Sequence, residues 1–438
     1  MLMKYKRKAS WFYFRKFSIS APLLFILVSA VANASSIKYD VSGSYRLRYE
    51  TLHNPIFPTT RDERDKSNER ISSQLLVKGQ VAWNNFQVTA ELADSRVFLD
   101  DNDPTLTSSQ VNTLEPIQFF MRYTLPRNGG LKAVSIGRMT IDHGSRRLLA
   151  QAVYRNTKNS FDGVLLDWVW NKWDIRGFYL LPVSRNPSTS QALDNNERAF
   201  DKSVSERKIF GLYSTSPDDN VKLQSYWFKE DDSARLSTKN RDLFTLSVDY
   251  TWSIANTWKA NVEVIGQTGT SHETTSATDL TEKEVRGFMM HGAIEKQLKL
   301  GTLLRAEFDY ISGDNDASDD TITNFDSLYG VRRFDFGPTD VYQAMPRRNL
   351  VAIGARSVNT AFDHHNLMVS YKAMWYEEAP ESVDSFIGNQ IEFRWRWQVK
   401  PNLRLALGGA YLKKGKGFER GDYSGDSRFL FTGARYTF

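Results

Sequence analysis

The sequence is organised as a series of short segments in which apolar and polar residues alternate. In the first of them, Tyr45, Leu47 and Tyr49 alternate with Arg46 and Arg48. A β-strand displays successive side chains on opposite faces, so each segment predicts a strand with one apolar and one polar face. We count about eighteen such segments, which begin near residues 41, 71, 86, 116, 131, 160, 173, 207, 221, 243, 257, 285, 302, 349, 365, 387, 402 and 427.

The links between these segments alternate in length. The links at 51–70, 100–114, 140–159, 184–206 and 312–348 are long, whereas those at 84–85, 126–130, 171–172 and 216–220 are short. Short periplasmic turns and long extracellular loops on alternate sides are typical of outer-membrane barrels. The pattern therefore predicts an all-β fold, an antiparallel up-and-down transmembrane β-barrel of about 18 strands, and disfavours a β-sandwich. A barrel of this size leaves an aqueous lumen unless loops fill it.

The two ends of the chain agree with export to the outer membrane. Phe438, Tyr436, Ala434, Thr432 and Leu430 form one largely apolar face of a strand that finishes on an aromatic residue. At the other end, a basic stretch at 4–16, a short apolar stretch at 23–28 and an A-x-A site at 32–34 indicate a secretory signal peptide. We therefore expect a signal peptide at 1–34, one barrel domain at 35–438 and a bacterial outer-membrane location.

Composition removes several classes of function. Taking the six basic residues of 1–34 from the 57 in the whole chain leaves 51 basic and 51 acidic residues, so the expected mature chain is neutral. The basic character of the whole sequence belongs to the signal peptide and does not indicate a nucleic-acid partner. The chain has no cysteine, which excludes disulfides and thiolate metal sites.

The middle of the chain carries motifs of a known family. Residues 137–149 (GRMTIDHGSRRLL), 154–157 (YRNT) and 161–164 (FDGV) occur in order, followed by 263–269 (EVIGQTG), 310–314 (YISGD) and 324–329 (NFDSLY). This arrangement resembles the alginate-export outer-membrane porin family. Met139 stands where that family usually has Gln, and Tyr154 where it often has Trp. The resemblance implies an eighteen-stranded passive channel for export of an anionic polysaccharide such as alginate.

Charged residues on the predicted lumen face are the candidates for the transport path. Arginine suits a carboxylate cargo because its planar fork binds both oxygens, and weak repeated contacts suit a moving polyanion. The alternative is that arginine–carboxylate ladders only brace the wall. The candidate path residues are Arg46, Arg48, Arg122, Arg138, Arg146, Arg147, Arg155, Arg176, Arg305, Arg394, Arg396, Arg435, Glu263 and Asp309. We favour Arg394/Arg396 and Arg46/Arg48, since closure brings the first strand near the last ones; Arg404 is also predicted to face the lumen.

We expect no enzyme, cofactor or metal. Asp142, His143 and Ser145 lie too close in sequence to face one reacting atom, and His364 and His365 are neighbours whose side chains point apart. The aspartate-rich link at 312–348 is read either as a constriction loop or as a solvated external loop. Expected partners are outer-membrane lipid, an anionic polysaccharide or small anionic solute, and periplasmic export partners. The alternative function is a porin for small anionic or amphiphilic solutes.

Overall fold

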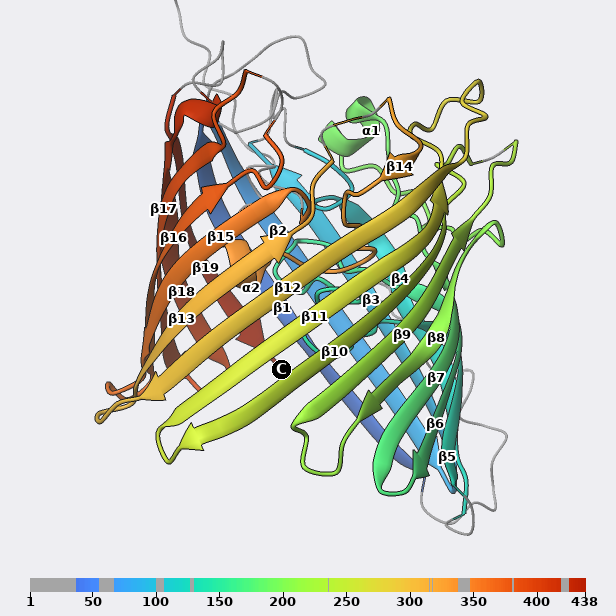
Figure 1. Ribbon diagram of the computed structural model, residues 1–438. Coiled ribbons are helices and arrows are strands. Elements are labelled where there is room, and N and C mark those ends of the chain that lie inside the picture. The colour runs from blue at the N-terminus through green and yellow to red at the C-terminus, as the bar shows by residue number, and fades with distance from the viewer. Residues whose placement is uncertain are drawn as a thin grey trace, which may run out of the picture.

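A computed structural model describes residues 37–54, 67–99, 106–126, 130–234, 236–314, 316, 318–337, 347–379, 382–418 and 425–438. The predicted signal peptide lies outside these residues. The described residues form one sheet of 19 strands, in which β14 is a two-residue parallel addition to β12 and the other 18 build the wall (Figure 1). The predicted closed antiparallel barrel of about 18 strands is confirmed.

The strands run in chain order around the barrel. Their bounds are β1 Lys38–His53, β2 Ser67–Trp83, β3 Phe86–Phe98, β4 Asn112–Thr124, β5 Leu131–Met139, β6 Phe161–Trp170, β7 Trp173–Pro182, β8 Arg207–Thr215, β9 Val221–Glu230, β10 Asp242–Ala255, β11 Trp258–Ser271, β12 Lys283–Gln297, β13 Thr302–Ile311, β14 Thr321–Ile322, β15 Leu350–Asn359, β16 His365–Trp375, β17 Phe386–Lys400, β18 Leu403–Lys414 and β19 Ser427–Thr437. The short helices are α1 Ser190–Asp194, α2 Arg333–Phe336 and the 3-10 turn η2 Lys416–Phe418.

Burial follows the alternation of the sequence, but with the apolar side outward. On β1 the side chains of Tyr45 and Leu47 are more than 40% exposed, whereas Arg46 and Arg48 are less than 10% exposed. This inversion of a soluble core is what a barrel in lipid requires, because hydrocarbon replaces the core on the outer face. The polar face of each strand therefore points into the lumen.

The barrel closes between β1 and β19. Gly43 and Phe438 exchange two backbone hydrogen bonds, of 2.8 and 3.0 Å. A side chain at Gly43 would place its Cβ 2.5 Å from the Phe438 ring, so glycine is needed for this close approach. The outward face of β19 carries Leu430, Tyr436 and the terminal aromatic, as predicted from the sequence.

Two loops fold back into the barrel. Residues 140–160 connect β5 to β6, and the segment that carries α2 connects β13 to β15. Figure 1 shows α2 inside the ring of strands, while α1 and β14 lie at the end that carries the long links. By the rule for outer-membrane barrels, that end is extracellular and the end with the short turns is periplasmic. The two inserted loops narrow the lumen and build the site described next.

Candidate functional site

Between the wall and the two inserted loops lies a cavity of about 300 Å³, and the described residues that line it include nine arginines and a single acidic residue, Asp142. We call this cavity the arginine pocket. Its apolar lining includes Tyr154, Phe334 and Phe431. The nine arginines are Arg46, Arg48, Arg146, Arg155, Arg333, Arg394, Arg396, Arg404 and Arg435.

Strand register places three of these arginines in one row. Arg46 of β1 lies opposite Arg435 of β19, and Arg435 lies opposite Arg404 of β18. Like charges directly opposed across a sheet destabilise it. The wall therefore holds a row of guanidinium groups that its own packing does not favour.

Few of these charges are neutralised. Arg48 bonds Glu50 at 2.8 Å, and Arg333 bonds Glu392. Within the described part of the chain, Arg394, Arg396, Arg404 and Arg435 have neither an ion pair nor a side-chain hydrogen bond. The Nε atoms of Arg394 and Arg435 are also buried without a partner. These unpaired guanidinium groups concentrate positive charge in the arginine pocket.

The 140–160 loop is fastened to this wall by its backbone. Arg46 Nη2 donates to the carbonyl oxygen of Arg155 at 2.7 Å, and Arg48 Nη1 donates to that of Tyr154 at 3.2 Å. The buried Asn156 amide donates to the carbonyl oxygens of Ser73, Arg96 and Gln110 at 2.8–3.2 Å. The sequence YRNT at 154–157 thus ties the loop to β1, β2, β3 and the segment before β4.

An ion-pair network holds α2 against the opposite wall. Arg147 bonds Asp335 at 2.8 Å and Glu263 of β11 at 2.7 Å, and Arg347 bonds Asp335 at 2.7 Å. Burial by itself would raise the pKa of Asp335, but Arg147 and Arg347 outweigh it and hold the pKa well below its usual range. Asp335 therefore stays ionised, and its ion pairs with Arg147 and Arg347 hold α2 in place.

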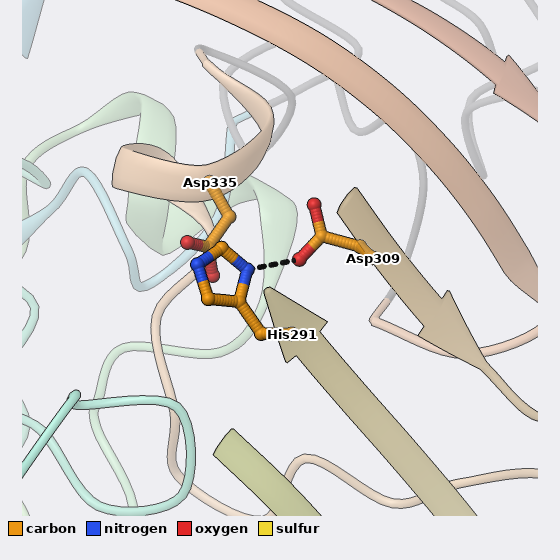
Figure 2. A group of neighbouring side chains, drawn as sticks. All are labelled: His291, Asp309 and Asp335. Carbon is orange, nitrogen blue, oxygen red and sulfur yellow. Dashed lines mark hydrogen bonds and ion pairs between the residues drawn. The ribbon is translucent and has the colours of Figure 1, made fainter. Parts of the chain in front are cut away.

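His291 and Asp309 extend this network, as Figure 2 shows. His291 Nδ1 lies 2.7 Å from Asp309, and its Nε2 accepts from Arg305 at 3.0 Å, so Nδ1 carries the proton. Lys372 bonds the other oxygen of Asp309 at 2.9 Å. Although His291, Asp309 and Asp335 approach one another within 4.8 Å, both ring nitrogens and both carboxylates are already engaged by protein groups. The arrangement is a charge-balanced anchor for α2.

The structure brings together about half of the candidate path residues. Arg46, Arg48, Arg146, Arg155, Arg394, Arg396 and Arg435 all line the arginine pocket. The others lie in ion pairs along the wall: Arg122 and Arg176 with Asp167, Arg138 with Glu115 and Asp162, Arg305 with Glu295 and Glu307, Arg147 with Glu263, and Asp309 with Lys372.

Sequence reasoning missed two members of the site and left out a third. Arg404 was predicted to face the lumen but was not chosen, although pairing β18 with β19 would have placed it beside Arg435. Arg333 and the ring of Tyr154 reach the pocket from loops. We find no local sequence signal that would have placed them there.

The His143 segment has a structural role. Its Nδ1 lies 3.0 Å from the Tyr226 hydroxyl, and its ring stacks on Tyr213. Asp142 instead accepts hydrogen bonds from Gln151. Burial lowers the pKa of His143 to about 3, so the ring is neutral at physiological pH. These contacts pack the 140–160 loop against β8 and β9.

A second cavity, of about 310 Å³, shares Arg146 and Phe334 with the arginine pocket but faces β10–β13. Its lining mixes both signs of charge, with Asp249 and Glu295 beside Lys259 and Arg305. We call it the mixed-charge pocket.

The helices of the described residues are all short, and none could cross a membrane.

Comparison with solved structures shows the same architecture. OpdQ from Pseudomonas aeruginosa matches with a TM-score of 0.56 and 14% identity, over 91% of this chain and 97% of that one. OpdK from the same organism, solved with vanillate, gives 0.57 and 12% over 91% and 98%. OccAB1 from Acinetobacter baumannii gives 0.58 and 11% over 91% and 96%. At this identity the likeness establishes the fold.

A search among curated proteins found no match. The family model described as alginate export matches residues 38–429, which covers nearly the whole described barrel. Family and fold are those of outer-membrane channels, which are not enzymes. The chain is therefore an outer-membrane β-barrel channel and belongs to the alginate export family.

Proposed function

We propose that this channel passively exports an anionic polysaccharide of the alginate type, with the arginine pocket as its constriction. The observation that carries the proposal is the group of arginines that β17, β18, β19 and β1 contribute to the pocket; among the described residues, Arg394, Arg396, Arg404 and Arg435 have neither an ion pair nor a side-chain hydrogen bond. Guanidinium groups recognise carboxylates through paired N–H donors. A polymer with one carboxylate on each sugar meets several of these donors at once and can exchange one for the next.

A comparison with the arginines elsewhere on the wall, which lie in ion pairs, supports the role of the arginine pocket in transport. Arginines that only brace strands are expected to lie in ion pairs, as Arg122 and Arg176 do with Asp167. Arg394 and Arg396 have no such pair, so bracing does not account for them. Conduction needs sites that attract a solute without holding it, and several separate guanidinium groups meet that condition better than one tight site.

A second candidate is a porin for small anionic or amphiphilic solutes. The mixed-charge pocket favours it, because adjacent groups of both signs suit a small molecule better than a uniform polyanion. A solved structure of similar fold contains vanillate, a small aromatic carboxylate. Both candidates need the arginine pocket, and they differ in the size of the cargo.

Planar-bilayer recording separates the two candidates. For export, alginate oligomers should block the current of the wild-type channel, while small organic acids such as vanillate and gluconate should permeate poorly. Permeation by the small acids together with no effect of the oligomers would favour the second candidate and count against export.

The arginine pocket is tested by charge reversal. In Arg394→Glu/Arg396→Glu, we expect the reversal potential in a KCl gradient to shift towards cation preference. The matched control is Lys202→Glu/Arg428→Glu, which makes the same change in net charge at exposed positions outside the pocket. An unchanged reversal potential in the first variant would remove these arginines from the path.

A further inference from the structure

Tyr154 is the one aromatic ring that joins the wall arginines of the arginine pocket to α2 among the cation–ring contacts of the described residues. The guanidinium carbon of Arg48, on β1, lies 4.8 Å from the ring centroid. That of Arg333, on α2, lies 4.4 Å from the same centroid. A cation close to an aromatic face is attracted by the ring quadrupole. The ring therefore holds together two charges that repel each other.

The position of this ring is fixed by its neighbours in sequence. The carbonyl oxygens of Tyr154 and Arg155 accept from Arg48 and Arg46, and the Asn156 amide is bonded to three backbone carbonyls of the wall. Phe431 meets the ring edge-on at 6.5 Å. With two guanidinium groups already on the ring, stacking of a sugar is not its task. Its ring acts by positioning arginines.

The hydroxyl of Tyr154 points to a second task. It is buried and has no hydrogen-bond partner within the described residues. The lining of the arginine pocket around Tyr154 includes Arg46, Arg394 and Arg396. Arginine has donors only, so these neighbours can donate to the phenol oxygen but cannot accept its proton. An anion with oxygen atoms, seated among the guanidinium groups, supplies the missing acceptor.

We propose that Tyr154 determines the anion specificity of the channel: its ring positions Arg48 and Arg333, and its hydroxyl donates a hydrogen bond to a carboxylate of the cargo. A halide offers a weaker and less directional acceptor than a carboxylate oxygen, so the hydroxyl favours carboxylates over chloride. This inference rests on the proposed anion channel and deepens it by naming a residue that sorts anions by their chemistry.

Two substitutions separate the ring from the hydroxyl. Tyr154→Phe keeps the ring and removes the hydroxyl, so we expect the alginate-oligomer concentration that half-blocks the chloride current to rise about threefold or more while the KCl reversal potential stays unchanged. Tyr154→Leu removes both, so the KCl reversal potential should also move towards zero. Tyr154→Trp, which restores a broad aromatic face and an N–H donor, should recover the wild-type values.

The controls are chosen so that folding does not obscure the result. Tyr179→Phe and Tyr179→Leu make the same changes at an exposed tyrosine of β7, outside the arginine pocket. Barrel formation is followed for every variant by heat-modifiable gel mobility. An unchanged half-blocking concentration of alginate oligomers in Tyr154→Phe would overturn the hydrogen-bond role. A KCl reversal potential unchanged in folded Tyr154→Leu would overturn the positioning role.

The ion preference of the wild-type channel separates the role of Tyr154 from the proposed function. If the wild-type channel prefers cations, the proposed function is wrong whatever Tyr154 does. If the wild type prefers anions and Arg394→Glu/Arg396→Glu reverses that preference while the Tyr154 variants behave as wild type, only the specificity role of Tyr154 is overturned.

Discussion

Individual residues of the lumen divide into those that stabilise the barrel and those that cost stability. Glu50 shows the first kind, since it accepts a hydrogen bond from Arg70 and forms an ion pair with Arg48, both at 2.8 Å, and is almost fully buried. The row Arg46, Arg435 and Arg404 shows the second, because three like charges face one another on adjacent strands. Such an unfavourable arrangement is expected where binding, and not folding, decides the residue type.

This division makes a prediction for Arg435. Arg435→Gln should raise the free energy of unfolding, by about 0.2–1 kcal/mol, because it removes repulsion across two strand pairs. It should at the same time lower the chloride-to-potassium permeability ratio. Urea unfolding in detergent measures the first effect and bilayer recording the second. Arg122→Gln is the contrasting variant, since it breaks the ion pair with Asp167 and should destabilise the barrel. Loss of stability in Arg435→Gln would contradict the account of the row.

Among the structural elements, α2 is the one whose position depends most on charge. Its four residues all contact cations or acids: Arg333 bonds Glu392, Phe334 lies against Arg146 at 4.9 Å, Asp335 bonds Arg147 and Arg347, and Phe336 lies against Lys372 at 5.0 Å. A helix of four residues has little stability of its own. Removing one charge should therefore be enough to loosen it.

Asp335→Asn tests this dependence. The substitution leaves Arg147 and Arg347 without their shared carboxylate, and breaking a buried ion pair typically costs about 3–5 kcal/mol. We expect α2 to detach from the lumen wall for part of the time. This motion should raise the single-channel conductance and add current fluctuations. Asp316→Asn, at an exposed position of the same connection, is the control and should behave as wild type. Equal conductance and noise in Asp335→Asn and wild type would show that α2 is held by something else.

The 140–160 loop responds to pH through His143. The folded pKa is lowered to about 3 by burial, whereas an unperturbed histidine titrates near about 6.5. The loop is thus fully stabilised above about pH 6.5, and this contribution is lost as the pH falls towards 3, because the displaced ring binds a proton that the packed ring does not. Asp335 loses its own contribution only at lower pH, as its unfolded pKa lies near about 3.9.

We therefore expect open-channel noise to rise as the pH is lowered from 7 to 4.5, and to rise much less in His143→Phe. Phenylalanine keeps the stacking on Tyr213 without a titratable group. Recording both channels across this range, at constant ionic strength, checks the prediction. An equal rise of noise in the two channels would assign the acid response to another group.

At the scale of the whole molecule, the wall could be predicted from the sequence and the interior only in part. The predicted strand starts near 41, 86, 131, 173, 302, 365 and 427 lie within three residues of the observed ones, because a membrane enforces strict alternation on each strand. Closure then fixed which strands are neighbours, and this placed Arg435 beside Arg46.

The course of the two inserted loops could not be predicted from the alternation within strands. Tyr154 and Arg333 are 179 positions apart in the numbering and meet because two loops fold into the same lumen, which alternation within strands does not reveal. Whether the 312–348 link enters the lumen was likewise left open by its aspartate-rich composition. Asp335 in fact turns inward to Arg147, and the exposed Asp319 and Asp320 lie near β14. A count of acidic residues does not distinguish a buried anchor from a solvated turn.

The whole barrel is also where screening by salt becomes informative. The expected mature chain is neutral, so any anion preference comes from the uneven placement of charge and not from its total. Mobile ions screen exposed charges over about 30 Å at 0.01 M but over only about 3 Å at 1 M. An anion preference that arises from distant surface charge should therefore vanish at high salt. An anion preference that arises from guanidinium groups in contact with the solute should persist.

We expect the chloride-to-potassium permeability ratio to fall between 0.05 and 1 M KCl without reaching unity. The remaining preference should fall towards unity in Arg394→Gln/Arg396→Gln, because these arginines line the pocket and have no ion-pair partner among the described residues. Lys202→Gln/Arg428→Gln, at exposed positions, should change the ratio only at low salt. A wild-type ratio of one at 1 M KCl would mean that the arginine pocket acts at a distance and does not bind the solute, which would contradict its role as the constriction.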